Sequence, residues 1–151
     1  MPQSLSAVYV HLIFSTKERR PFLQDTAFRA SVHAYLGAVS RELDCPALLV
    51  GGVEDHVHIL ARLGRPITQS DWVKELKRVS NGWIKTQHAD LQDFQWQAGY
   101  GDFSVSHSNI DSVLRYIADQ AEHHRKQTFQ DEYRAFLKKH AVEYDERYVW
   151  D

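Results

Sequence analysis

Two apolar, strand-like stretches separated by only three residues place the strongest constraint on the fold of this chain. Residues 47–52 read ALLVGG and residues 56–63 read HVHILARL, and both are rich in the aliphatic residues typical of strands. The intervening Val-Glu-Asp link is too short for a crossover connection, so the two strands are expected to pair as an antiparallel hairpin. The chain is therefore expected to contain an antiparallel sheet.

Patterns on either side of the hairpin predict further elements. Residues 7–16 have the β-branched and aromatic composition of a buried strand. Apolar residues three and four positions apart between Asp25 and Leu43 indicate an amphipathic helix. A second helix is expected after the hairpin, with Ser70 as its N-cap and with Asn81–Gly82 weakening its last turns.

The last third of the sequence is predicted to be mostly helical. Before it, residues 90–108 carry aromatic residues and two glycines, which indicates one broken strand or two short ones. Residues 108–127 predict one long helix capped by Ser108 or Asn109, and a further helix capped by Thr128 follows. The residues expected to face inward on the long helix are Ile110, Val113, Leu114, Ile117 and Ala121. The tail is expected to be extended or irregular.

The predicted order is strand, helix, strand, strand, helix, strand, helix. Its first six elements match the split βαβ pattern of ferredoxin-like and RRM-like α+β folds, in which helices cover one face of an antiparallel sheet. The other face is left for a ligand or for the later helix. The length of 151 residues predicts one domain that spans residues 1–151.

Composition narrows the class of protein. The single cysteine, Cys45, allows no intramolecular disulfide and is compatible with a reducing cytoplasm, where we expect the protein. We find no signal peptide and no run of about 18 apolar residues, so no membrane partner is expected. The net charge of −2 is unlike that of a generic nucleic-acid binder, so contacts to nucleic acid would have to come from local basic clusters.

A histidine pair interrupts the second strand of the hairpin. Side chains alternate along a strand, so His56 and His58 point to one face and Val57 to the other. His-x-His on a strand can give two nitrogen ligands to one metal ion. Two surface histidines on a half-exposed strand are the alternative.

A second pair lies on the long predicted helix. Tyr116 and Gln120 are four residues apart and therefore share a helical face, with His123 close to them. A tyrosine hydroxyl near a metal is a potential nucleophile, and an amide oxygen is a potential further ligand. The alternative is a boundary tyrosine beside a solvated glutamine.

The ordered set of motifs resembles a known family. DHVHIL followed about sixty residues later by YIADQAEHH is similar to the single-tyrosine HUH transposases of small bacterial insertion sequences, the TnpA-like family that includes REP-associated tyrosine transposases. The resemblance extends from VYVHLIFSTKERRPFL through LKRVSN to this helix. It implies that His56, His58 and Gln120 hold Mg²⁺ or Mn²⁺ and that Tyr116 is the nucleophile.

The same resemblance implies an activity and partners. The expected enzyme is a metal-dependent single-strand DNA nickase and strand transferase, which cleaves and rejoins DNA through a 5′-phosphotyrosine intermediate. Its expected substrate is single-stranded DNA with hairpins at element ends, bound by a homodimer associated with the nucleoid. The resemblance leaves open whether Tyr116 acts in its own subunit or in the partner's.

Basic and aromatic side chains are candidates for DNA contacts. The basic residues expected to bind phosphates are Lys17, Arg19, Arg20, Lys74, Lys77 and Arg78. The aromatic residues Trp83, Trp96 and Tyr100 are candidates for stacking on bases, with packing in the core as the alternative.

Three other functions fit parts of the pattern. A domesticated relative would keep the chemistry and act on palindromic repeats of a host genome. A non-catalytic ferredoxin-like module would bind single strands by stacking on its sheet. A metal-dependent phosphodiesterase would use water and form no covalent adduct.

Overall fold

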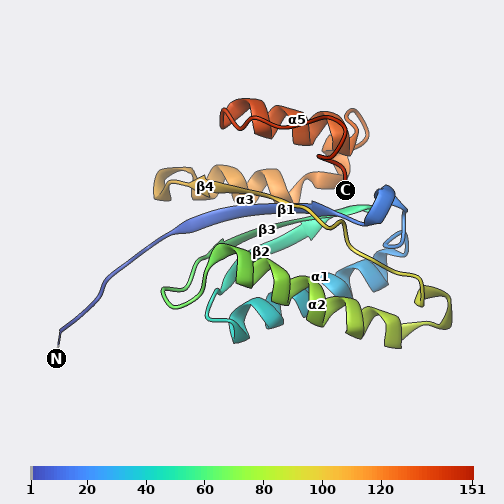
Figure 1. The fold of residues 1–151 in the computed structure, drawn as a ribbon, viewed down its shortest axis with the longest axis horizontal. Helices are drawn as coiled ribbons and strands as arrows, with labels where there is room; N and C mark the ends of the chain where they lie inside the picture. Colours follow the sequence, from blue (N-terminus) through green and yellow to red (C-terminus); the bar gives the residue numbers. More distant parts are fainter. Residues whose placement is uncertain (1) are drawn as a thin grey trace.

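A four-stranded antiparallel sheet organises the computed structural model, which describes residues 2–151 and thus all of the predicted domain except Met1 (Figure 1). The strands lie side by side in the order β2-β3-β1-β4. Their bounds are β1 Tyr9–Ser15, β2 Ala47–Gly52, β3 His56–Arg62 and β4 Gly101–Val105. The expected hairpin is present as β2 and β3, and the predicted ferredoxin-like α+β fold is confirmed.

Two long helices cover one face of the sheet. Helix α1 spans Thr26–Glu42 and helix α2 spans Gln69–Gln87, and both lie on the lower side of the sheet in Figure 1. Short 3₁₀ turns follow β1 (η1, Lys17–Arg19) and α2 (η2, Ala89–Leu91). No helix within residues 2–151 combines the length and the apolar character needed to cross a membrane.

The opposite face is covered by the C-terminal helices. Helix α3 spans Ile110–Ala118 after the turn η3 at His107–Asn109, the short helix α4 spans Gln120–His123, and helix α5 spans Phe129–Lys139. In Figure 1, α3 and α5 lie above the sheet. The molecule thus has three layers, with the sheet in the middle.

The prediction of one long helix over residues 108–127 was wrong. The helix is interrupted at Asp119, whose backbone angles of φ −96° and ψ 19° end α3, and α4 begins at Gln120. Of the residues expected to face inward, Ile117 is fully buried, whereas Ala121 is exposed because it lies beyond the interruption. Asn109 takes the N-cap position of α3 without a capping hydrogen bond from its side chain.

Local capping chemistry sets the other helix starts. The Asp25 carboxylate accepts hydrogen bonds from the first turn of α1, and the Thr128 hydroxyl caps α5 as predicted. The prediction of Ser70 as the cap of α2 was wrong, because the extended residue Thr68 accepts the bond from the Asp71 amide at 3.1 Å. Asn81–Gly82 does not end α2, which continues to Gln87.

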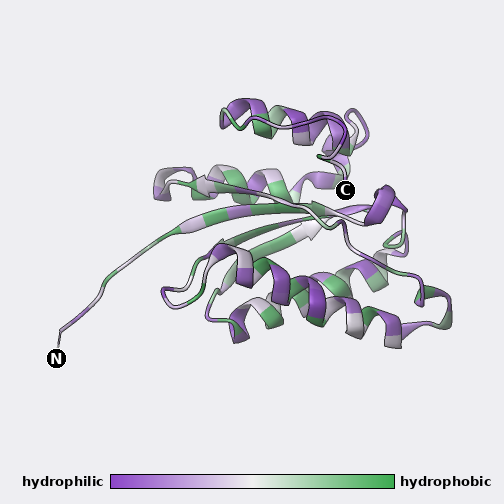
Figure 2. Cartoon of the chain, in the orientation of Figure 1, coloured by the Kyte–Doolittle hydropathy of each residue, from purple (hydrophilic) through white to green (hydrophobic). Residues whose placement is uncertain are grey.

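The hydrophobic core is divided by the sheet. The larger cluster joins the sheet to α1 and α2, and its central side chains include Leu12, Phe14, Val57, Ile59 and Trp72. The smaller cluster seats α5 on the other face and contains Ile13, Phe103, Phe129, Tyr133 and Leu137. In Figure 2 much of β2 and β3 is hydrophobic, α1 and α2 alternate between hydrophilic and hydrophobic segments, and α5 is mostly hydrophilic. Alternation along β1 and β3 therefore gives each face its own side chains.

Gly51 in β2 allows α3 to lie directly on the sheet. A methyl group at this position would lie 2.7 Å from Ile117 Cγ2 and 2.9 Å from the Ile117 carbonyl oxygen. We expect Gly51→Ala to push α3 outward and to lower the free energy of unfolding by about 1–3 kcal/mol in urea titrations. The control is Gly82→Ala in α2, where nothing lies within 4 Å. Gly82→Ala should stabilise the protein by up to about 1 kcal/mol. If both substitutions changed the free energy of unfolding equally, the close approach of α3 to Gly51 would not explain the result.

Asp102 in β4 should make stability depend on pH. Both of its carboxylate oxygens are buried without a hydrogen-bond partner in residues 2–151, and burial raises its pKa to about 7. The folded protein holds this proton more tightly than the unfolded chain, so stability falls as pH rises from about 4 to 7. We expect Asp102→Asn to add about 1–3 kcal/mol at pH 8 and little at pH 4, measured by urea unfolding. Equal gains in stability at pH 4 and pH 8 would contradict the assignment of this pH dependence to Asp102.

Candidate active site

The histidine pair lies on β3 and faces the C-terminal helices. His56 and His58 are fully buried, and the centroids of their rings are 5.2 Å apart. Val57 points to the opposite side and packs in the larger core cluster. Strand alternation thus places both imidazoles in one layer, between the sheet and α5. They are not the surface histidines of the alternative interpretation.

The structure brings Tyr116 and Gln120 to the same place. Gln120 is fully buried at the start of α4, and its Oε1 lies 3.1 Å from His56 Nε2. Tyr116 is half-buried on α3, with its ring centroid 5.9 Å from that of His58. The two predicted pairs therefore meet within one chain, despite the interruption at Asp119.

Glu132 lies in the middle of this group and was missed in the sequence. It is fully buried on α5, and its Oε1 lies 3.1 Å from His58 Nε2 and 3.1 Å from His124 Nε2. Its Oε2 accepts hydrogen bonds from the Tyr116 hydroxyl and, at 3.1 Å, from Gln120 Nε2. No spacing connects Glu132 to the other residues, because α5 reaches the site only through tertiary packing.

His124, not His123, completes the cluster. His124 follows Gln120 by four residues, so helical spacing was a usable signal for it. The imidazole of His123, which was expected near the pair, stacks on the Tyr116 ring with centroids 4.5 Å apart. His123 thus lies beside Tyr116 as expected, whereas His124 was missed in the sequence.

A second layer of side chains orients the histidines. Asp55 Oδ1 lies 2.7 Å from His56 Nδ1, and His11 Nε2 lies 2.8 Å from His58 Nδ1. In each case the partner engages the ring nitrogen that faces away from Glu132. Such contacts fix the ring and leave Nε2 directed at the cluster, as is common for metal-binding histidines.

Burial and neighbouring carboxylates set the charges. Burial lowers the pKa of His56, but hydrogen bonds with Asp55 and Glu132 outweigh this and raise it to about 9. At His58 burial dominates and lowers the pKa to about 4. Burial raises the pKa of Glu132, but its bonds with His124, His56 and His58 outweigh this and hold it well below its usual range.

The tyrosine is held in its protonated form by the same surroundings. Burial and the negative charge of Glu132 raise the pKa of Tyr116 above its usual range. Its hydroxyl therefore donates to the carboxylate and is a poor nucleophile while that negative charge is uncompensated. A nearby cation would oppose the effect of Glu132.

The donor set fits a divalent metal ion. Ligand-type atoms of His56, His58, His124 and Glu132 all lie within 4.8 Å of one another, and the Gln120 amide oxygen adjoins them. Three imidazole nitrogens with a carboxylate and an amide oxygen form a mixed nitrogen and oxygen set, which suits transition metals such as Mn²⁺ better than Mg²⁺. A cation would also balance the charge of the buried carboxylate.

A cavity gives access to the tyrosine. It has a volume of about 310 Å³ and lies between α3 and α5, and the residues that line it include His11, Tyr116, Gln127, Glu132 and Lys139. A cavity of this size is at the lower end of typical ligand sites. It provides a route from solvent to the hydroxyl.

Three of the six basic residues expected to bind phosphates lie at the same end of the sheet as the cluster. Strand pairing aligns Ser15 with His56, so the η1 turn that follows β1 is close to the start of β3. Lys17 and Arg20 line a hollow of about 310 Å³ together with Lys85. Arg20 also pairs with Asp93 at 2.9 Å, and the Arg19 guanidinium lies 5.8 Å from the Trp150 ring centroid.

The other three basic residues lie on α2, across the sheet from the cluster. Lys74 and Arg78 are exposed, and Arg78 pairs with Glu75 at 2.7 Å. Lys77 instead donates to the carbonyl oxygens of residues 97–99 at 2.6–3.3 Å, and burial lowers its pKa to about 8. The Lys77 ammonium is already engaged within the fold and is therefore not available for a DNA phosphate.

The aromatic candidates for base stacking are partly used within the fold. Trp96 is buried and donates its indole N–H to Ser80 Oγ at 2.9 Å, so core packing is its role. Trp83 is half-buried against Tyr35, with ring centroids 4.3 Å apart. Tyr100 is also half-buried and lies beside the Lys77 ammonium.

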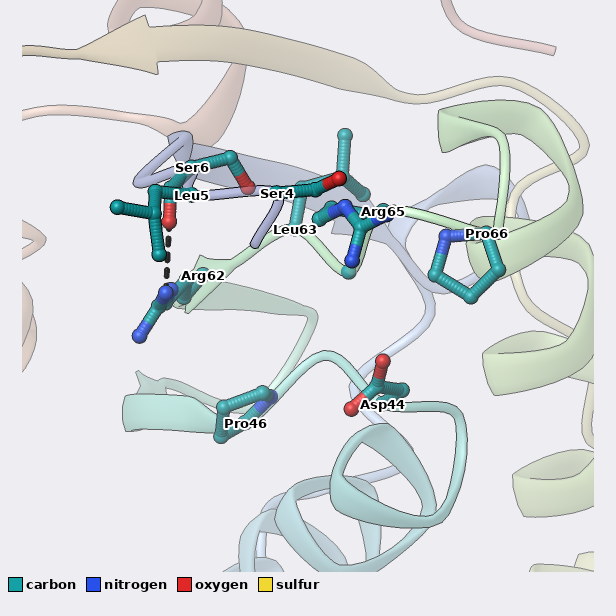
Figure 3. Close-up of a pocket in the computed structure, with 10 residues that line it drawn as sticks. Ser4, Leu5, Ser6, Asp44, Pro46, Arg62, Leu63, Arg65 and Pro66 are labelled. Carbon is teal, nitrogen blue, oxygen red and sulfur yellow. Dashed lines mark hydrogen bonds between the residues drawn. The ribbon is translucent and has the colours of Figure 1, made fainter. Parts of the chain in front are cut away.

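A hollow of about 740 Å³ at the opposite end of β3 is separate from the site. It lies between the N-terminal segment and the residues that follow β3, and the Arg62 guanidinium donates to the Ser6 carbonyl oxygen there at 2.6 Å (Figure 3). None of the predicted site residues lines it. Volume alone therefore does not identify the functional site in this chain.

Comparisons with known proteins agree with the geometry. The family model for IS200-like transposases matches residues 4–120. A crystal structure of a candidate transposase from Deinococcus radiodurans R1 is 22% identical, with a TM-score of 0.65 and coverage of 80% of this chain and 95% of that one. A REP-associated tyrosine transposase bound to a REP hairpin is 13% identical, with a TM-score of 0.53 and coverage of 80% and 68%. No curated protein sequence matches significantly.

The family match covers the whole sheet and ends at Gln120. It therefore includes the histidine pair and the tyrosine on which the sequence resemblance was based, but not Glu132. The two solved structures show that the same fold is present in other proteins of this kind. This chain accordingly belongs to the IS200-like transposase family.

Proposed function

We propose that this transposase cleaves and rejoins single-stranded DNA through a covalent bond between Tyr116 and a 5′ phosphate. The observation that carries the proposal is the position of the Tyr116 hydroxyl, which bonds to Glu132 beside two buried histidines that have the arrangement of metal ligands. Membership of the family supports the reaction class. We further propose that residues 1–151 act as one catalytic domain.

The residues divide the reaction between them. The Tyr116 oxygen forms a bond to phosphorus, the bond from phosphorus to the 3′ oxygen breaks, and the proton lost by the hydroxyl is matched by one gained by the 3′ oxygen. A second 3′ hydroxyl reverses the exchange at a new junction, so no ATP is needed. Mg²⁺ or Mn²⁺ held by His56, His58 and Gln120 would supply positive charge that stabilises the phosphate oxygens in the transition state.

The proposed substrate is single-stranded DNA with a hairpin. Lys17, Arg19 and Arg20 support it, because they lie at the same end of the sheet as the cluster, where they can contact phosphates. Lys74 and Arg78 would contact a more distant part of the DNA. The related fold bound to a REP hairpin supports a hairpin substrate. The family resemblance supports a homodimer that acts on DNA in the cytoplasm.

The test uses a single-stranded oligonucleotide that carries the hairpins flanking the gene and a fluorophore at its 3′ end. The label is on the 3′ side because that fragment stays on the protein. With Mn²⁺ we expect a covalent adduct on a denaturing gel. No adduct should form when EDTA removes the metal ion, and mass spectrometry should locate the bound DNA on Tyr116. Cleavage without an adduct would indicate a water-using phosphodiesterase, and binding without cleavage would indicate a non-catalytic module. Dispersed genomic palindromes as a second substrate test the domesticated alternative.

Asp55 provides a milder perturbation of the same site. Its carboxylate is 2.7 Å from His56 Nδ1, and loss of such a partner commonly weakens metal binding by about 10–100-fold. We expect Asp55→Asn to weaken Mn²⁺ binding within this range, measured by calorimetry, while the fold is kept. Asp111→Asn on the exposed start of α3 is the control and should bind as the unmodified protein does. An unchanged affinity of Asp55→Asn for Mn²⁺ would show that Asp55 does not support metal binding.

A further inference from the structure

Glu132 faces the cluster with two oxygens that have different neighbours. Its Oε1 lies 3.1 Å from His58 Nε2, 3.1 Å from His124 Nε2 and 3.4 Å from His56 Nε2. Three imidazole nitrogens thus converge on one carboxylate oxygen, and the side chains of His56, His58 and Glu132 are almost completely buried. A single cation in this space would be within reach of the oxygen and of all three rings.

The other oxygen faces the nucleophile. Oε2 accepts hydrogen bonds from the Tyr116 hydroxyl and from Gln120 Nε2. The side chain therefore connects the group of nitrogen ligands to the attacking oxygen through one rigid carboxylate. A carboxylate is well suited to this, because its two oxygens can accept in different directions.

Helix α5 holds Glu132 in place. Phe129 and Tyr133 on either side of it are buried in the smaller core cluster, and the Thr128 hydroxyl caps the start of the helix. Glu132 itself is 1% exposed. A side chain fixed by packing on a regular helix is more precisely positioned than one on a loop.

We propose that Glu132 is both a ligand of the metal ion, through Oε1, and the residue that positions the Tyr116 hydroxyl, through Oε2. The inference rests on the proposed function and extends it to a residue beyond the segment that matches the family, which ends at residue 120. His124 joins Glu132 as a ligand from the same part of the chain. Nitrogen ligands together with this carboxylate favour Mn²⁺ over Mg²⁺.

The experiment compares Glu132→Gln with Glu143→Gln, an exposed glutamate outside the site. Mn²⁺ binding is measured by calorimetry and by the paramagnetic resonance signal of free Mn²⁺, without DNA. We expect Glu132→Gln to raise the dissociation constant for Mn²⁺ at least about 10-fold, and Glu143→Gln to leave it unchanged. Unchanged Mn²⁺ affinity in Glu132→Gln would overturn its role as a ligand.

The positioning role has a separate measurement. At saturating Mn²⁺ and DNA, the single-turnover rate of adduct formation in Glu132→Gln should still be about 10-fold or more below that of Glu143→Gln. The amide has only one oxygen, so it cannot offer one to the metal ion and another to the Tyr116 hydroxyl. Full recovery of the rate at saturating Mn²⁺ would overturn this role. If the unmodified protein binds Mn²⁺ through Glu132 but forms no adduct, the proposed function fails and the assignment of the ligand stands.

A crystal of the unmodified protein soaked with Mn²⁺ tests the ligand assignment even if Glu132→Gln does not fold. Anomalous diffraction at the manganese edge locates the ion directly. We expect the peak between Glu132 Oε1 and the Nε2 atoms of His56 and His58. A peak coordinated by the histidines and Gln120 without Glu132 would overturn the proposal.

Discussion

Replacing Tyr116 by phenylalanine is expected to abolish the covalent adduct with single-stranded DNA. The variant loses only the attacking oxygen, so the rate of adduct formation should fall by about 10³-fold or more, to the background of the assay. The fold should change little, because one hydrogen bond to Glu132 contributes about 1 kcal/mol on average. The measurement is the single-turnover rate on a denaturing gel, together with the Mn²⁺ affinity of the DNA-free protein.

Tyr148→Phe is the matched control, since Tyr148 is 62% exposed near the C-terminus. It should form the adduct at the normal rate. Tyr116→Phe should still bind Mn²⁺, because the ring carries no ligand. An adduct that survives in Tyr116→Phe would show that another nucleophile does the chemistry, and the proposed mechanism would then fail.

Replacing His56 by alanine is expected to remove the metal response. Unmodified protein with Mn²⁺ at 100 times its dissociation constant should gain about 2.7 kcal/mol of stability. For a domain of this size that gain corresponds to a rise in Tm of roughly 5–10 °C. In His56→Ala we expect almost no rise and a loss of adduct formation of about 10²-fold or more.

The shift in Tm is compared within each variant, with and without Mn²⁺. This matters because truncating a fully buried histidine lowers the starting stability by itself, by about 2–4 kcal/mol. His107→Ala, at an exposed position before α3, is the control and should keep the full response. A normal Mn²⁺ response in His56→Ala would exclude His56 as a ligand.

The sequence was sufficient for the elements whose signals are local. The short link between β2 and β3 was enough to predict the hairpin, and the apolar spacing between Asp25 and Leu43 was enough to predict α1. It was insufficient where two residues close together in the sequence could both begin the same helix. Thr68 and Ser70 are both capping residues, and only the extended backbone of Thr68 shows which one acts.

The same distinction applies to the site. Strand alternation placed His56 and His58 on one face, and the four-residue spacing brought Tyr116 and Gln120 together. The interruption of the helix at Asp119 could not be predicted, because no Pro or Gly marks it in the sequence. His124 was missed although its four-residue spacing from Gln120 was a usable signal. Glu132 was beyond prediction, because its place depends on how the apolar face of α5 packs on the sheet.

The position of Glu132 after Tyr116 in the sequence has a consequence for protein synthesis. The ribosome synthesises the sheet, the histidine pair and Tyr116 before α5, so a nascent or prematurely terminated product contains Tyr116 without the carboxylate of Glu132. Such a product can retain the large core cluster with α1 and α2, which contains no residue of α5. If Glu132 acts as we propose, such a product forms the covalent adduct with DNA more slowly than a chain whose translation has passed α5.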